Sequence, residues 1–418
     1  MNVAFVPVHS VLHDETAVTS IISRYGGLLK GVGDHRFERR DAGTLAPDDE
    51  AVFFVVTGGT ERLILDAVEG RPGPVTLLAH PGQNSLPASL EVLARLQQSG
   101  RLGKVVYLDA EAPPARVAEG LTELREALLL AATHRRLHTA RVGLVGRPSD
   151  WLVASSPGPG AAGEVWGPEV VPVEMDEVLR ALDEVRARPN EAAALKDAFL
   201  KGAEAVREPD DGDLTKAAQV YVALRLLVDR ERLDALTVRC FDLVLRAGTT
   251  GCLALSMLTD EGVIAGCEGD LPATLTMLLL HHLSGETPFM ANPARVDPAA
   301  GSLWLAHCTV GRRLLTAYTI RSHFESGLGV GIQGKLRPGP VTVARIGGEG
   351  LNRLYVAEGT LTANGVAEDL CRTQVQVKLD GGVDYFLRRP LGNHHVLVYG
   401  HWGEILRAYA GLIGVETV

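Results

Sequence analysis

The stretch GCEGDLPATLTMLLL, residues 266–280, lies where the pattern of the chain changes. Before it, short apolar runs alternate with amphipathic stretches, and after about residue 287 short β-like runs alternate with turns. Within it, Glu268 and Asp270 stand directly before an apolar run that predicts a buried helix. Acids near a helix start are stabilised by the helix dipole, and Pro272 suits a first turn. Two explanations therefore stay open for these acids, a helix start and a metal or acid–base site.

Residues 1–138 are predicted to form a first α/β domain, because short apolar runs alternate there with amphipathic stretches. The expected strands are VAFVPV (3–8), AVFFVV (51–56), VTLLAH (75–80) and KVVYLD (104–109), and the expected helices are 88–99 and 117–137. This alternation implies a parallel sheet that is covered on both faces. The loops VVTGGTE and AHPGQNS follow strands but match neither GxGxxG nor a Walker pattern, which disfavours nucleotide binding.

Residues 139–286 are predicted to form a second α/β domain that carries the candidate metal-site acids. It starts at ARVGLVGRPSDWLVAS (140–155), and further strands are expected at EVVPVEM (169–175) and LTVRCFDLV (236–244). Helices are expected at 175–188, 190–208 and 214–233, and the stretches 252–262 and 271–285 close the domain.

Residues 287–418 are predicted to form an antiparallel β-barrel-like domain with a late histidine ligand. Seven short runs between Gly, Pro and Asn turns carry this prediction: 302–308, 318–324, 330–336, 339–347, 353–362, 373–379 and 395–401. A short helix is expected at WGEILRAYAGLIG (402–414). The predicted fold class is therefore α/β plus β, with two Rossmann-like α/β domains followed by a β-barrel-like C-terminal domain.

Bulk properties exclude several classes of protein. A net charge of −10 without a basic block argues against a nucleic-acid partner. No apolar run reaches about 18 residues, so no membrane span is expected. The first residues, MNVAFVPVHS, read as a strand and not as a signal peptide. The 5 cysteines are scattered and odd in number, which suggests a reducing, cytoplasmic compartment.

Histidines gather in the last third of the chain, close to the acids of CEGD. They are His281, His282, His307, His323, His394, His395 and His401. Asp242 ends an apolar run, where a strand is expected to meet a loop. Mn²⁺ or Mg²⁺ prefers carboxylate oxygens, and Mn²⁺ accepts an imidazole beside them. Asp242, one acid of CEGD and a histidine of the last domain would supply such a set, with His394 or His395 of NHH (393–395) as the favoured histidine.

Five motifs occur in an order that resembles the L-fucose isomerase / L-arabinose isomerase superfamily, most of all its fucose isomerase-like branch. They are CEGDLPATLTMLLLHHLSGETPFMAN (267–292), HC (307–308), SHFESG (322–327), CRTQ (371–374) and GNHHVLVYG (392–400). The resemblance implies two α/β domains followed by a β-barrel-like domain. It also implies aldose–ketose isomerisation with Mn²⁺, or Mg²⁺ or Co²⁺ in its place. Relatives of this kind assemble as trimers or hexamers, so a homo-oligomer is expected.

The resemblance also implies roles for individual residues. The metal ligands would be Asp242, Glu268 or Asp270, and His394 or His395. Asp242, Asp270 and Glu268 are the candidates for moving a proton between C1 and C2 of the sugar. The sequence departs from the family in two places, because Asp242 stands where the family has a glutamate and Val296 where the arabinose enzyme has a histidine. The candidate substrate-binding residues are Arg147, Trp151, His307, His323, Arg372 and Asn393.

Two functions remain open from the sequence. The first is isomerisation of a monosaccharide that is L-fucose-like, a pentose or a 6-substituted hexose, and an arginine such as Arg147 or Arg372 would suit an anionic substituent. The second is a non-catalytic sugar-binding or scaffold protein on the isomerase fold, which the departures at Asp242 and Val296 favour. The persistence of the CEGD, HC and NHH elements favours the enzyme, because a pure binder needs no metal-type cluster.

Overall fold

The protein was analysed as a computed structural model, which describes residues 2–158 and 160–418. The chain divides into two compact units, one ending at Arg136 and the other beginning at Leu137. The second unit holds both a parallel sheet and a closed barrel, so the predicted division at residue 286 stays a prediction. No helix in the described ranges is long and apolar enough to cross a membrane.

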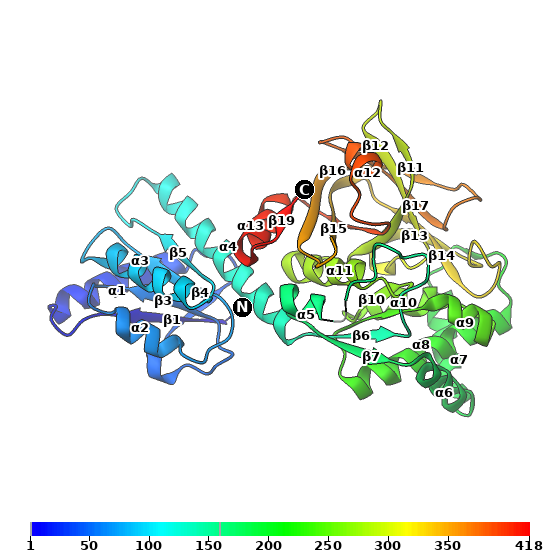
Figure 1. The fold of residues 1–418 in the computed structure, drawn as a ribbon, viewed down its shortest axis with the longest axis horizontal. Helices are drawn as coiled ribbons and strands as arrows, with labels where there is room; N and C mark the ends of the chain where they lie inside the picture. Colours follow the sequence, from blue (N-terminus) through cyan, green and yellow to red (C-terminus); the bar gives the residue numbers. More distant parts are fainter. Residues whose placement is uncertain (1, 159) are drawn as a thin grey trace. The chain divides into compact units, whose positions relative to one another are not determined.

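The first unit is built on a parallel five-stranded sheet with the order β2-β1-β3-β4-β5. Its strands are β1 (Asn2–Val8), β2 (Arg36–Arg39), β3 (Ala51–Val55), β4 (Val75–Ala79) and β5 (Gly103–Tyr107). Its helices are α1 (Glu15–Leu29), η1 (Ala42–Thr44), α2 (Glu61–Val68), α3 (Ser85–Gln98) and α4 (Pro114–Thr139), the last of which continues past Arg136. Figure 1 shows β1, β3, β4 and β5 side by side.

Successive residues of β1 point to opposite faces of this sheet, and each face has its own core. Val3 and Phe5 pack with residues of α1 and α4, whereas Ala4 and Val6 pack with residues of α2 and α3. A strand that is buried on both faces reads as a continuous apolar run, which is why VAFVPV predicts a covered parallel sheet.

The second unit begins with a parallel four-stranded sheet of order β10-β9-β6-β7. Its strands are β6 (Arg141–Val145), β7 (Glu169–Val173), β9 (Ala235–Val238) and β10 (Ile264–Cys267). Its helices are α5 (Ala161–Trp166), α6 (Met175–Arg186), α7 (Pro189–Leu200), α8 (Asp211–Glu231), α9 (Cys240–Ala247), α10 (Cys252–Asp260) and α11 (Leu271–Ser284).

Six antiparallel strands then close into a barrel, because β15 pairs with both β18 and β16 in the order β15-β18-β11-β12-β17-β16. These strands are β11 (Phe289–Asp297), β12 (Ser302–His307), β15 (Gly339–Gly347), β16 (Arg353–Gly365), β17 (Thr373–Leu379) and β18 (His395–Tyr399). A smaller sheet contains β8 (Ala205–Val206), β13 (Leu315–Arg321) and β14 (Gly331–Leu336). The remaining elements are η2 (Arg312–Leu314), α12 (Asp384–Arg388), α13 (Gly403–Ile413) and β19 (Glu416–Thr417).

Helix α11 joins the parallel sheet to the barrel. It contacts β9 and β10 of the sheet and β11, β15 and β18 of the barrel, and Figure 1 shows it between β10 and β15. Every residue from Leu271 to Leu280 is buried. A helix that is apolar all round is stable only when it is enclosed on all sides. The stretch 266–280 therefore places Glu268 and Asp270 at the junction of sheet and barrel.

The predicted fold class is confirmed, with two local corrections. The run LTVRCFDLV is not one strand, because β9 ends at Val238 and α9 begins at Cys240. Asp242 therefore lies in the first turn of a helix and not where a strand meets a loop. Strand β11 was not predicted, since the run MANPARVD carries a proline and little alternation.

Candidate active site

Three side chains from distant parts of the second unit meet at the junction of sheet and barrel. Glu268 follows β10, His307 ends β12, and His394 directly precedes β18. One ligand atom from each lies within 4.8 Å of the other two. Among the residues that the structure describes, this is the one group of acids, histidines or cysteines with such a spacing. We call Glu268, His307 and His394 the cluster.

Glu268 is held in an unusual backbone conformation. Its φ is +62°, in the left-handed region, and that of Gly269 is +72°. A non-glycine residue there costs about 1–3 kcal/mol and persists mainly at functional sites. The turn is fixed by the loop after β6, because the Ser149 amide donates to the Glu268 carbonyl at 2.8 Å. The Trp151 indole N–H donates to Oε2 of Glu268 at 2.6 Å.

His394 is fully buried, and its two ring nitrogens have different surroundings. Nδ1 lies 2.9 Å from Oδ2 of Asp270. The buried Nε2 has no hydrogen-bond partner in the described part of the chain and lies 3.7 Å from Oε1 of Glu268. Burial opposes protonation, but the carboxylates of Asp270 and Glu268 outweigh it and raise the pKa of His394 to about 9. Two carboxylates that favour a proton on this ring also favour a metal cation at Nε2.

Asp270 is the N-cap of α11 and is sealed from solvent. It accepts from the Ala273 amide at 2.8 Å and lies 3.3 Å from Nη1 of Arg345. Burial alone would raise the pKa of Asp270, but the Arg345 guanidinium and the contact with His394 lower it to about 2. Because this carboxylate is fully buried and contacts Nδ1 of His394, Asp270 can orient the imidazole ring.

His307 offers a neutral imidazole to the cluster. Burial, followed by the nearby His394, lowers the pKa of His307 to about 4. Its Nδ1 lies 2.8 Å from Oγ1 of Thr309, which leaves Nε2 as the ligand atom, and its ring meets that of His394 edge to face at 5.4 Å. A neutral imidazole is the form of histidine that binds metal ions.

The cluster fits a divalent metal ion. One carboxylate and two imidazoles form a donor set that suits Mn²⁺, Co²⁺ or Zn²⁺ better than Mg²⁺, which prefers oxygen alone. A histidine ligand usually donates its other N–H to a carboxylate, as His394 does to Asp270. The orphaned Nε2 is the atom that such an ion would satisfy.

Three rings, those of Trp151, Phe241 and His323, form an aromatic wall next to Glu268. The Trp151 ring meets Phe241 edge to face at 4.9 Å, and Phe241 meets His323 in the same way at 5.7 Å. Trp151 is 52% exposed, so this wall reaches the surface. Arg147 belongs to the same loop as Trp151, and its largely exposed side chain has one loose ion pair, with Asp150 at 3.4 Å.

Three of the predicted site residues are bound to other residues outside the cluster. Asp242 pairs with Arg239 at 3.1 Å. Arg372 donates to the Ser322 carbonyl at 2.9 Å and pairs with Glu368 at 3.0 Å. Asn393 donates to Asn292 at 2.6 Å.

His395 lies among the rings of Tyr355, Tyr385 and Phe386, with Nε2 3.1 Å from the Tyr385 hydroxyl. Burial and then the Arg345 charge lower the pKa of His395 to about 3. Of the adjacent pair of histidines, the structure thus brings His394 and not His395 to the cluster.

Sequence reasoning missed Phe241 and Arg345. Phe241 gave no signal, because an aromatic residue in an apolar run is usually core. Arg345 did give one, since a charged residue inside the run VTVARIG is rarely buried without a partner.

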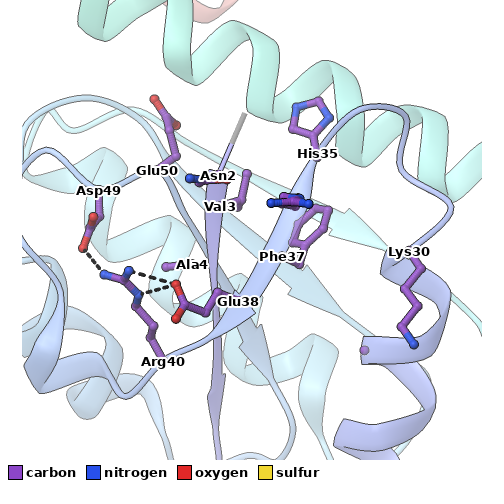
Figure 2. A pocket seen from close by; sticks show the side chains of 12 residues that line it. Asn2, Val3, Ala4, Lys30, His35, Phe37, Glu38, Arg40, Asp49 and Glu50 are labelled. Carbon is purple, nitrogen blue, oxygen red and sulfur yellow. Dashed lines mark hydrogen bonds and ion pairs between the residues drawn. The ribbon is translucent and has the colours of Figure 1, made fainter.

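A cavity of about 610 Å³ lies in the first unit, whereas the cluster belongs to the second (Figure 2). It lies at the amino ends of β1 and β3, with β2 beside it, and Arg40 in its lining pairs with Glu38 and Asp49. Ligands of parallel sheets bind at the carboxyl ends of strands. We therefore place the candidate site at the cluster and not at this cavity.

Comparisons with known proteins find sugar isomerases that are similar to part of the chain. No protein-family model matches the chain. It is 27% identical over 301 residues to a sulfoquinovose isomerase of Alkalicoccus urumqiensis, which covers 68% of this chain and 66% of the relative. It is 29% identical over 220 residues to a sulfoquinovose isomerase of Priestia aryabhattai, covering 50% and 49%. The chain thus spans from about half to just under two thirds of the length of these relatives, and it is similar to sulfoquinovose isomerases over that part.

Proposed function

We propose that the protein is a metal-dependent aldose–ketose isomerase that acts on a 6-substituted hexose, with sulfoquinovose as the first substrate to test. The observation that carries the proposal is the buried, unpartnered Nε2 of His394, which faces Glu268 and His307 while Nδ1 is held by Asp270. The similarity to sulfoquinovose isomerases supports the reaction and the class of sugar.

Glu268, His307 and His394 would hold the ion, for which Mn²⁺ is our first choice, Co²⁺ the alternative and Mg²⁺ the less suited ion. When bound, a divalent ion supplies Lewis-acid stabilisation of negative charge on the sugar oxygens. The cluster differs from the set expected by resemblance, because His307 stands in place of Asp242.

Isomerisation moves a proton between C1 and C2, and this requires a general base that the sugar can reach, for which the carboxylates of CEGD are the candidates. Asp270 is fully buried, whereas the side chain of Glu268 is 14% exposed. Burial disfavours the charged form of Glu268, but contacts with His394 and Trp151 leave its pKa below the ordinary value. We therefore assign the proton transfer to Glu268, and the orientation of His394 to Asp270.

A sulfonate group at C6 is negatively charged and needs a cation in a chain of net charge −10. Arg372 is bound by Ser322 and Glu368, whereas the Arg147 side chain has one loose contact among the described residues, with Asp150. Arg147 also lies in the loop that fixes Glu268 through Ser149 and Trp151. We assign recognition of the anionic substituent to Arg147, and contact with the ring of the sugar to Trp151, Phe241 and His323.

The test is turnover after the protein has been stripped with a chelator and reloaded with Mn²⁺, Co²⁺ or Mg²⁺. Interconversion is followed by NMR for sulfoquinovose and for a panel of 6-deoxy and unsubstituted aldoses. We expect metal-dependent conversion of sulfoquinovose to its ketose, and little conversion by Glu268→Gln. Metal binding without turnover of any sugar would instead support the non-catalytic sugar-binding protein.

A further inference from the structure

Arg345 is a fully buried guanidinium on β15, at 0% exposure. Its neighbours Val343, Ala344 and Ile346 are buried and apolar, so an apolar side chain would suit this strand. Removing a guanidinium from water is costly, and a buried ion pair is often no more stabilising than apolar residues of similar volume. Stability alone therefore gives no reason for an arginine at this position.

The contacts of Arg345 converge on one residue of the cluster. Nη1 donates to the main-chain carbonyl of His394 and lies 3.3 Å from Oδ2 of Asp270, which in turn holds the imidazole of His394. Nη2 donates to Oγ of Ser155 at 2.6 Å. One guanidinium thus fixes His394 at two points, at its backbone directly and at its ring through Asp270.

The backbone just before His394 passes very close to this guanidinium. Gly392 has a φ of +151°, and a Cβ placed there would lie 2.4 Å from Nη2 of Arg345. Only glycine leaves room for so close an approach. Within the described ranges, Nε of Arg345 is buried without a hydrogen-bond partner, so this arrangement gives up one hydrogen bond. Losing this hydrogen bond lowers the stability, which is consistent with an arginine that serves to hold His394 in place.

We propose that Arg345 is a positioning residue for the metal site, holding His394 so that Nε2 points at Glu268 and His307. This inference rests on the proposed function, because it assigns a task to Arg345 at that same site. Arg345 contacts neither the ion nor the sugar, and it acts through Asp270 and the backbone of His394.

The test is the dissociation constant of Mn²⁺, measured by calorimetry on the full chain for the parent protein, Arg345→Met and Arg345→Lys. We expect about 10–100-fold weaker binding for R345M, as for loss of other groups behind a metal ligand. R345K, which can still donate to Asp270, should lose less. Arg321→Lys is the matched control, because Arg321 is also buried and ion-paired, with Glu208 and Glu368, away from the cluster. It should keep the parental dissociation constant.

The outcomes separate this inference from the proposed function. No Mn²⁺ binding by the parent protein would overturn both. Parental affinity in a folded R345M, with only a lower melting temperature, would overturn the positioning role alone. If neither Arg345 variant folds, Ser155→Ala decides, since it removes one hydrogen bond from Nη2. Several-fold weaker binding in S155A supports the proposal, and an unchanged dissociation constant contradicts it.

Discussion

Nδ1 of His394 lies 2.9 Å from Oδ2 of Asp270, and both side chains are fully buried. The two residues are 124 positions apart, on either side of the junction between sheet and barrel. Asp270 also caps α11, the helix that contacts both layers. The same carboxylate therefore serves a helix start and a candidate metal site, so the two explanations of the acids in CEGD are compatible.

Asp270→Asn should weaken Mn²⁺ binding about 10–100-fold, because a neutral amide orients the imidazole of His394 less firmly. It also leaves Arg345 buried without its carboxylate, so the free energy of unfolding should fall by about 3–5 kcal/mol. Calorimetric titration and urea unfolding measure the two effects. A variant with parental Mn²⁺ affinity would contradict the role assigned to Asp270.

Arg147→Gln should raise KM for sulfoquinovose about 10-fold or more, with little change in kcat. The reason is that a hydrogen bond to a charged group, distant from the reacting carbons, contributes about 1.5–3 kcal/mol of binding. Initial rates for sulfoquinovose and for an uncharged aldose provide the measurement, and the uncharged sugar should be unaffected. Arg246→Gln, an exposed arginine of α9 that pairs with Asp176, is the control. Equal losses for both sugars would exclude recognition of the sulfonate by Arg147.

Gly269→Ala should destabilise the protein by more than about 1 kcal/mol and weaken Mn²⁺ binding. A Cβ at Gly269 would lie 2.7 Å from the Arg147 carbonyl oxygen and 2.8 Å from Cα of Pro148, so the turn that carries Glu268 must shift. Gly248→Ala is the matched control, with a φ of +61° and no atom within 4 Å of the added carbon. If both variants bind Mn²⁺ equally, the close packing of this turn does not position Glu268.

Glu208 should stabilise the second unit in a pH-dependent manner. Hydrogen bonds from Arg321 and the Ser322 amide outweigh partial burial and lower the pKa of Glu208 from 4.5 to about 2. Because the folded-state pKa is the lower one, this stabilisation is complete above about pH 4.5 and is lost as the pH falls towards 2. Glu208→Gln should therefore lower the stability more at pH 7 than at pH 3 in urea unfolding.

The control for this pH dependence is Glu204→Gln, because Glu204 forms an exposed pair with Lys335 at 3.5 Å. Exposed pairs contribute about 0–1 kcal/mol, so E204Q should change little at either pH. Equal destabilisation by E208Q at pH 7 and pH 3 would show that the ionised carboxylate is not what stabilises this region.

The sequence predicted the sheets and the barrel well, but it did not show which of two neighbouring residues belongs to the site. Continuous apolar runs identify covered parallel strands, but LTVRCFDLV fits a strand and a helix equally well, which misplaced Asp242. His394 and His395 could not be separated, since adjacent residues near a strand point to opposite sides. Asp270 could be placed at a helix start by its spacing. Its burial behind His394 depends on Arg345, from a strand 75 residues away.

The proposed metal site can be tested most directly by titrating Mn²⁺ into the metal-free protein. The EPR signal of the free ion reports how much Mn²⁺ stays unbound. His307→Ala and Asp242→Asn are compared with the parent, and circular dichroism confirms that each is folded. We expect a single tightly bound ion in the parent and in D242N, and its loss in H307A. Retention of the ion by H307A, together with its loss in D242N, would contradict the cluster of Glu268, His307 and His394 as the metal site.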